Sequence, residues 1–267
     1  MIIMSKKNKI LLFIIIGLII LITFFCKRSL NFNIEDTIPE NRTFKEYVVF
    51  YPQHQDDEVL WGGSAVRKAV NTLGSNHVFV VLVSDGTGVN VFKGKTYKNK
   101  TRKEKEEIRN KEFYAALYDL GVKRENIIIL ADIDNKPGTH FELMKEIALN
   151  FENKYKNVTH VAHSYKYDDH RMHRSNGKVI YTLYKEKRIK DAMFYLKPKY
   201  VKKLPKEKLI FFKAENTDDC QAIINACNEY RIINEEKDRR GVGYISAHSY
   251  FDKLLNDPQL TSILHLP

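Results

Sequence analysis

The feature that most constrains the fold is a regular alternation of strand-like and helix-like runs. Short runs rich in Val, Ile and aromatic residues recur along the chain, and longer runs with apolar residues at helical spacing follow them. The strand-like runs are 47–51, 77–83, 126–131, 158–162, 192–196 and 209–213, and the helix-like runs are 59–73, 102–120, 139–155, 177–187 and 217–233. Such alternation favours a mostly parallel sheet covered by helices on both faces. The sequence therefore predicts one α/β domain.

An apolar segment precedes this pattern. Ile10 to Cys26 is apolar over almost all of its 17 residues, which is the short end for a helix that crosses a membrane. A cleaved signal peptide is the alternative, but no small-x-small cleavage site follows. We expect a membrane anchor in residues 1–30, a polar linker in 31–45 and the folded domain in 46–267.

Charge bears on orientation and partners. Three lysines precede the apolar segment, whereas Lys27 and Arg28 follow it, and this slight excess favours the amino terminus inside and the domain outside the cell. The formal charge is +11, and five of these positive charges lie in the first 28 residues, which leaves +6 for the remainder. A basic domain suits an anionic surface. No motif supports nucleic-acid binding.

The first cluster of chemically active residues follows the first strand. His54 to Glu58 packs one imidazole and three carboxylates into a strand-to-helix turn. Such turns form the crevice at the carboxyl ends of parallel strands, where ligands usually bind. Nitrogen and hard oxygen donors together suit zinc or a similar divalent ion. The alternative is that the carboxylates only stabilise the first turn of the helix.

A second cluster follows the fourth strand, and an arginine on an apolar helix face lies between the two clusters in sequence. The stretch from His163 to His173 contains three histidines and two aspartates just beyond a strand end, so it can face the same crevice as His54. Arg109 falls near the centre of the apolar stripe of its helix. A guanidinium there must either pair with a carboxylate or contact a substrate.

These motifs resemble those of the zinc-dependent N-acetylglucosaminyl deacetylases of the PIG-L or LmbE-like family. The family's first motif is Ala-His-Pro-Asp-Asp-Glu after a strand, and here it stands as Gln53-His54-Gln55-Asp56-Asp57-Glu58. The resemblance spans roughly residues 47 to 175. It also includes Ser84-Asp85-Gly86, Arg109 with Glu112, Leu120-Gly121-Val122 and Asp169-His170.

The resemblance implies a Rossmann-like three-layer α/β/α fold and a set of site residues. His54, Asp57 and His170 would be the zinc ligands, and Asp56 the general base. The family's second motif is His-Pro-Asp-His, and aligning it on His170 puts Tyr167 in place of the first histidine. A tyrosine hydroxyl can donate to a developing oxyanion. His163 or His173 is the alternative source of that imidazole, and His173 is also an alternative to His170 in the motif.

The function that this implies is a membrane-anchored, metal-dependent hydrolase that removes acetyl from an N-acetylated amino sugar in a glycan or glycolipid. Arg109 would position an anionic part of the substrate. Two other functions fit the same residues: a carbohydrate-binding module that keeps the fold and metal but not the chemistry, and a metal-dependent phosphoesterase. The phosphoesterase is expected to hold ligands for a second metal ion.

Overall fold

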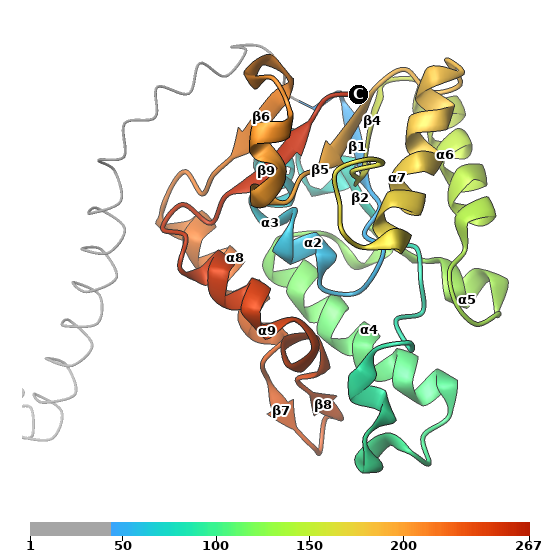
Figure 1. Ribbon diagram of the computed structural model, residues 1–267, viewed down its shortest axis with the longest axis vertical. Coiled ribbons are helices and arrows are strands. Elements are labelled where there is room, and N and C mark those ends of the chain that lie inside the picture. The colour runs from blue at the N-terminus through green and yellow to red at the C-terminus, as the bar shows by residue number, and fades with distance from the viewer. Residues whose placement is uncertain (1–43) are drawn as a thin grey trace, which may run out of the picture. The chain divides into compact units, whose positions relative to one another are not determined.

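A computed structural model describes residues 44–267 (Figure 1). The expected membrane anchor, and all but the last two residues of the expected linker, lie outside the described residues. Within residues 44–267, no helix combines the length and apolar character that crossing a membrane requires.

The core of the described domain is a seven-stranded sheet in the order β3-β2-β1-β4-β5-β9-β6. Its strands are β1 Tyr47–Phe50, β2 Val78–Leu82, β3 Ile127–Ile129, β4 Val158–His163, β5 Ala192–Tyr195, β6 Leu209–Phe212 and β9 Ser262–His265. The first five in this order pair in parallel, and β9 pairs antiparallel with both β5 and β6. The predicted mostly parallel sheet is confirmed.

Helices cover both faces of the sheet. The longer ones are α3 Gly63–Leu73, α4 Arg102–Asp119, α6 Phe141–Tyr155, α7 Arg171–Lys185, α8 Thr217–Glu229 and α9 Val242–Leu255, and the short ones are α2 Asp57–Leu60 and α5 Leu130–Asp134. Helices α6 and α7 pack on one face, and α3 packs on the other with α8 against it (Figure 1). The arrangement fits the predicted three-layer α/β fold.

Shorter elements complete the described chain. They are the two-stranded ribbon β7 Ile233–Asn234 and β8 Arg239–Arg240, and the 3₁₀ turns Ser75–His77, Asn90–Lys93, Lys95–Tyr97, Arg124–Asn126, Pro198–Lys203 and Lys206–Lys208.

The register of the central strands brings the two clusters together. Phe50 at the end of β1 pairs with Val161 on β4 and Val80 on β2. The segments that follow β1 and β4 therefore leave the sheet at the same edge, as parallel strands require. The strands themselves are held by a fully buried core that includes Val49, Val81, Ile180 and Phe194. This core fixes the relative positions of the carboxyl ends of β1 and β4, where the site is built.

Candidate metal centre

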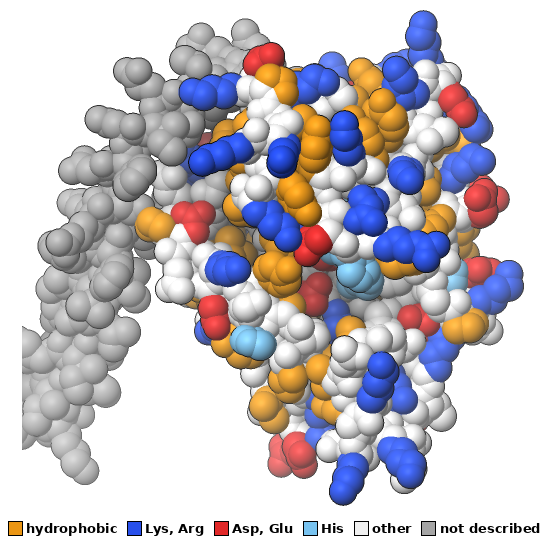
Figure 2. Space-filling model, in the orientation of Figure 1, with side chains coloured by type: hydrophobic (Ala, Val, Ile, Leu, Met, Phe, Trp, Pro, Cys, Tyr) orange, Lys and Arg blue, Asp and Glu red, His pale blue; other side chains and the backbone are white. Residues whose placement is uncertain are grey.

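A cavity of about 950 Å³ opens at the carboxyl ends of β1, β2 and β4. Its walls come from the turn after β1, the loop after β2, the segment after β4, and α9. The loop from Ser84 to Gly88 lines this cavity. Figure 2 shows histidine side chains at a hollow in this face of the molecule.

The turn after β1 brings His54 and Asp57 together. The backbone N–H of His54 donates to Oδ2 of Asp57 at 2.9 Å, and the same oxygen lies 3.2 Å from Nδ1 of His54. The indole N–H of Trp61 donates to the other oxygen, Oδ1, at 2.9 Å. Asp56 completes this turn with φ of 120°, a conformation that non-glycine residues rarely adopt. The carboxylate of Asp57 is therefore fixed at both oxygens and aimed at His54.

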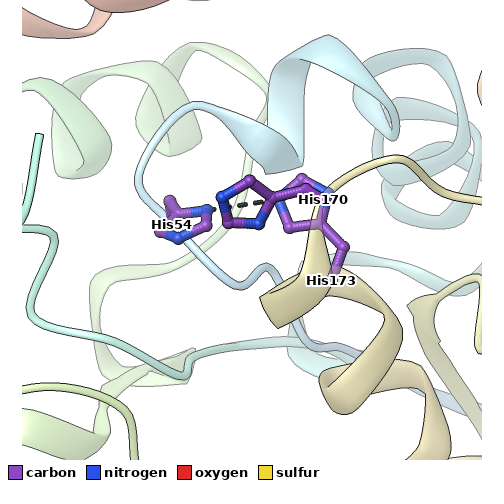
Figure 3. A group of neighbouring side chains, drawn as sticks. All are labelled: His54, His170 and His173. Carbon is purple, nitrogen blue, oxygen red and sulfur yellow. Dashed lines mark hydrogen bonds between the residues drawn. The ribbon is translucent and has the colours of Figure 1, made fainter.

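His173 supplies a third donor atom at the same point. Its Nε2 lies 3.2 Å from Nδ1 of His54 and 3.3 Å from Oδ2 of Asp57. Figure 3 shows His173, from the first turn of α7, directed at His54. A tetrahedral zinc ion with bonds of about 2.0–2.1 Å places its ligand atoms about 3.3–3.4 Å apart. These two nitrogens and one oxygen therefore match one face of a zinc tetrahedron, and their chemistry suits zinc.

Asp168 orients His173. Its Oδ2 lies 3.1 Å from Nδ1 of His173, which leaves Nε2 of the imidazole facing Asp57. Burial works against a charged imidazole here, but Asp57 and Asp168 outweigh it and raise the pKa of His173 to about 9. A carboxylate behind the distal nitrogen is the usual support of a metal-ligating histidine.

The other two histidines of the second cluster lie beside these donor atoms, and Nε2 of His163 is 3.2 Å from Oδ2 of Asp57. His170 is exposed at the cavity, and a ring nitrogen lies within 4.8 Å of ligand atoms on His54 and His173 (Figure 3). Burial, followed by the neighbouring histidines, lowers the pKa of His170 to about 4. His163 is fully buried and stacks on His173 at 3.9 Å between ring centroids. Its Nε2 accepts a hydrogen bond from the backbone N–H of Gln53 at 3.3 Å.

Asp56 and Arg109 form a buried pair beside the donor atoms. Nη2 of Arg109 donates to Oδ2 of Asp56 at 3.2 Å and to the backbone carbonyl of Gln55. Burial raises the pKa of Asp56 to about 7, although Arg109 acts to lower it. Both side chains line the cavity. Within residues 44–267, the Nε and Nη1 atoms of Arg109 make no hydrogen bond.

Tyr167 is not brought into the site. Its ring packs against Leu196, Leu209 and Ile263, and its backbone N–H donates to Ser164 at 2.9 Å. The sequence contained the signal that points to a different alignment. His170 and His173 have the His-x-x-His spacing of the family's second motif, three residues beyond the alignment chosen from Asp169 and His170.

Fold and donor geometry together define an α/β protein with a candidate divalent-metal centre at the carboxyl ends of its parallel strands. The profile of the PIG-L family, described as GlcNAc-PI de-N-acetylase, matches residues 48–184, and the chain belongs to this family. The predicted family membership is confirmed. No curated protein sequence gives a significant match.

Solved structures with the same fold differ widely in sequence. The N,N'-diacetylchitobiose deacetylase from Pyrococcus horikoshii is 14% identical, with a TM-score of 0.52 over 100% of this chain and 94% of that one. A deacetylase of teicoplanin biosynthesis is 13% identical, with a TM-score of 0.52 over 82% and 96%. The 4-carboxy-2-hydroxymuconate hydratase from Pseudomonas putida is also 13% identical, with a TM-score of 0.53 over 82% and 95%. At these identities the likeness establishes the fold alone.

Proposed function

We propose that this protein is a metal-dependent hydrolase that removes the acetyl group from an N-acetylated amino sugar of the N-acetylglucosamine type, within a glycan or glycolipid. One observation carries the proposal: Nδ1 of His54, Oδ2 of Asp57 and Nε2 of His173 lie 3.2–3.3 Å apart, and the buried carboxyl group of Asp56 stands beside them. The family description names a de-N-acetylase, which supports this choice of reaction.

His54, Asp57 and His173 are the residues that we propose hold the metal ion. The sequence prediction named His170 as the third ligand, but Nε2 of His173 meets both other donor atoms and is supported by Asp168. Zinc suits this donor set and leaves an open position for substrate. When bound, such an ion polarises an amide carbonyl and lowers the pKa of water.

The chain's own residues supply the proton transfers. Asp56 would accept a proton from the attacking water and return it to the leaving nitrogen, so that the amide C–N bond breaks to give acetate and a free amine. Arg109 holds the Asp56 carboxyl group through Oδ2 at 3.2 Å. His170 lies at the cavity with a low pKa, so its neutral imidazole can donate an N–H to the developing oxyanion. Arg109 would thus orient the base rather than bind an anionic part of the substrate.

The rival functions have less support. A pure binding module has no use for a buried carboxyl group beside the donor atoms. A two-metal phosphoesterase needs a second centre, but the two candidate ligand groups within residues 44–267 share His173. The fold also occurs in a hydratase, so the reaction must be argued from the site and tested directly.

The deciding experiment combines metal content with acetate release. The full chain is loaded with zinc, and acetate is measured with N-acetylglucosamine and its oligomers as substrates. Asp56→Asn should keep the metal and lower kcat by about 10²–10⁴-fold. Asp218→Asn, at an exposed carboxylate on α8, is the matched control and should leave kcat unchanged. Metal without turnover on a broad panel of N-acetylated sugars would instead favour the binding module.

The ligand assignment has its own test. His173→Gln should abolish stoichiometric zinc binding, whereas His170→Gln should retain the metal and lose turnover. The reverse result would restore the assignment of His170 as ligand.

We also propose that the apolar segment 10–26 anchors the protein in a membrane with the domain on the outer side. The sequence pattern supports this proposal. Fractionation of cells that express the full chain, with protease added from outside, tests the anchor and its orientation.

A further inference from the structure

A second cavity of about 310 Å³ adjoins the metal centre. It shares four wall residues with the first cavity, namely Leu60, Trp61, Lys197 and Tyr250. The rings of Trp61 and Tyr250 meet edge to face at 5.1 Å between centroids and stand between the two spaces. Nothing in the proposed reaction uses this second cavity.

The lining of the second cavity is largely apolar. Besides the two aromatic rings, the walls are formed by Leu60, Leu196, Pro198, Leu254 and Ile263. The carboxylate of Asp257 also lines it, but accepts backbone N–H bonds from Gln259 at 3.0 Å and Thr261 at 2.8 Å. A cavity with so few free polar groups suits an apolar ligand group better than a sugar ring with many hydroxyl groups.

Three lysines line this apolar space, and one of them, Lys253, makes no ion pair within residues 44–267. Lys197 and Lys199 line the cavity and share the carboxylate of Asp169, and Lys197 also pairs with Asp168 at 2.9 Å. Lys253 also lines it, and its ammonium group lies 5.8 Å from the centre of the Tyr250 ring, with no carboxylate within ion-pair distance in the described chain. Figure 2 shows lysine and arginine side chains crowded beside the histidine-lined hollow. The unpaired ammonium group of Lys253 therefore favours an anionic group at this point of the wall.

We propose that the second cavity binds an anionic amphiphile, in which an apolar group next to a phosphate, phosphonate or carboxylate fills the space between Leu196, Leu254 and Tyr250. The anionic group would meet Lys253 and Lys199 at the opening. The site does not depend on the hydrolase proposal. Because Trp61 forms its wall and also donates to Asp57, a ligand here borders the metal centre directly.

The chain provides its own reporter for this site. Trp61 is its one tryptophan, so tryptophan fluorescence reports on the wall between the two cavities alone. The probe is phenylphosphonate, which joins an apolar ring to an anion and has no ester bond that a phosphoesterase could cleave. The full chain in a non-ionic detergent is first dialysed against a chelator, so that the probe has no metal ion to bind.

We expect saturable binding of phenylphosphonate, with phenyl glucoside and inorganic phosphate each at least about tenfold weaker because each lacks one half of the ligand. Lys253→Glu should weaken the binding of phenylphosphonate about five- to tenfold, because it reverses the charge. Lys178→Glu, at an exposed lysine on α7 outside the cavity, is the matched control and should leave this affinity unchanged. Equal weakening by both variants, equal binding of inorganic phosphate, or no saturable signal overturns the proposal.

The outcome is separable from that of the hydrolase test. Acetate release without phenylphosphonate binding would reject only the second site. Phenylphosphonate binding without acetate release on any N-acetylated sugar would reject only the hydrolase.

Discussion

Gly177→Ala should destabilise the protein, although alanine is the better helix former. Gly177 lies in α7, and an added Cβ would stand 2.0 Å from the carbonyl oxygen of His163 and 2.6 Å from the backbone nitrogen of Tyr165. An ordinary contact begins near 3.4 Å, so α7 must retreat from the end of β4 by the difference, 1.4 Å. Because the obstructing atoms are backbone, no side chain can turn aside to make room.

The magnitude follows from three effects. Replacing a helical glycine by alanine contributes about 1 kcal/mol of stability. Forcing a methyl group into packed backbone costs about 3 kcal/mol, the upper end for overpacking. Asn176 holds α7 to the sheet through two hydrogen bonds: its side chain accepts from the backbone N–H of His163 at 3.1 Å and donates to the carbonyl of Tyr51 at 3.2 Å. Retreat of α7 stretches both bonds, at a cost of about 0.5 kcal/mol each. The free energy of unfolding should therefore fall by about 3 kcal/mol in total.

The same displacement should damage the metal centre. His173 lies one turn before Gly177 on α7, and metal–ligand distances tolerate errors of only about 0.2 Å. Zinc affinity should therefore fall together with stability. The assays are urea unfolding of the metal-free protein followed by circular dichroism, and a zinc competition titration of the folded variant.

Gly63→Ala is the matched control, because Gly63 is also a buried helical glycine. Its added Cβ would meet side chains rather than backbone, Ile223 at 3.3 Å and Val59 at 4.0 Å. The free energy of unfolding should stay within about 1 kcal/mol of the wild-type value. If Gly177→Ala proves as stable as the wild type and binds zinc equally well, then α7 does not pack against the end of β4 as closely as described above.

Three further predictions concern the supports of the site and the sheet. Asp168→Asn should weaken zinc binding about 10- to 100-fold, measured by competition titration, because it removes the charge that orients His173. Tyr230→Phe removes the hydroxyl that donates to buried Glu58 and should cost about 1 kcal/mol in urea unfolding, and an unchanged value would contradict that bond. Burial lowers the pKa of His265 to about 4, below its ordinary value of 6.5, so the unfolded chain binds the extra proton as pH falls. As pH falls from 6.5 to 4, His265 should therefore lower the free energy of unfolding by about 1.4 kcal/mol per pH unit. His265→Gln should show a shallower dependence of unfolding free energy on pH.

The parallel part of the sheet was predictable because each strand is buried on both faces. Val49, Val81 and Val161 are fully buried, and such strands appear as continuous apolar runs between helices. The insertion of β9 between β5 and β6 was not predicted. Ser262–His265 has only four residues, and its two antiparallel partners are set by packing at the sheet edge rather than by its own sequence.

The first motif was easier to interpret than the second for a physical reason. His54 and Asp57 lie three residues apart in one tight turn, so local backbone geometry alone brings them together. The direction of His170 and His173 depends instead on where α7 begins. Helix α7 starts at Arg171, which puts His170 at the helix cap and His173 in the first turn, facing inward.

The carboxylates of the second cluster show the same dependence. Asp169 was used to align the family motif, but its side chain pairs with Lys197 at 2.7 Å and Lys199 at 3.2 Å at the surface. Its neighbour Asp168 is the carboxylate that supports His173. Both aspartates contact Lys197, but Asp168 is the one that also reaches His173, and their sequence gives no indication of this difference.

Helix α4 links the proposed base to a part of the chain outside the family match. Arg109 and Glu112 lie on neighbouring turns of one face, and Arg109 pairs with Asp56. The carboxylate of Glu112 accepts the backbone N–H of Val242 at 2.7 Å and of Gly243 at 2.9 Å, which fixes the start of α9. Side chains of α9 line the same cavity as the metal centre, although the family match ends at residue 184. The base is thus held by the family's shared framework, and the wall that faces it belongs to this chain's own carboxyl-terminal segment. Substitutions in α9 that face the cavity should therefore alter which substrate is accepted before they alter the bond that is broken.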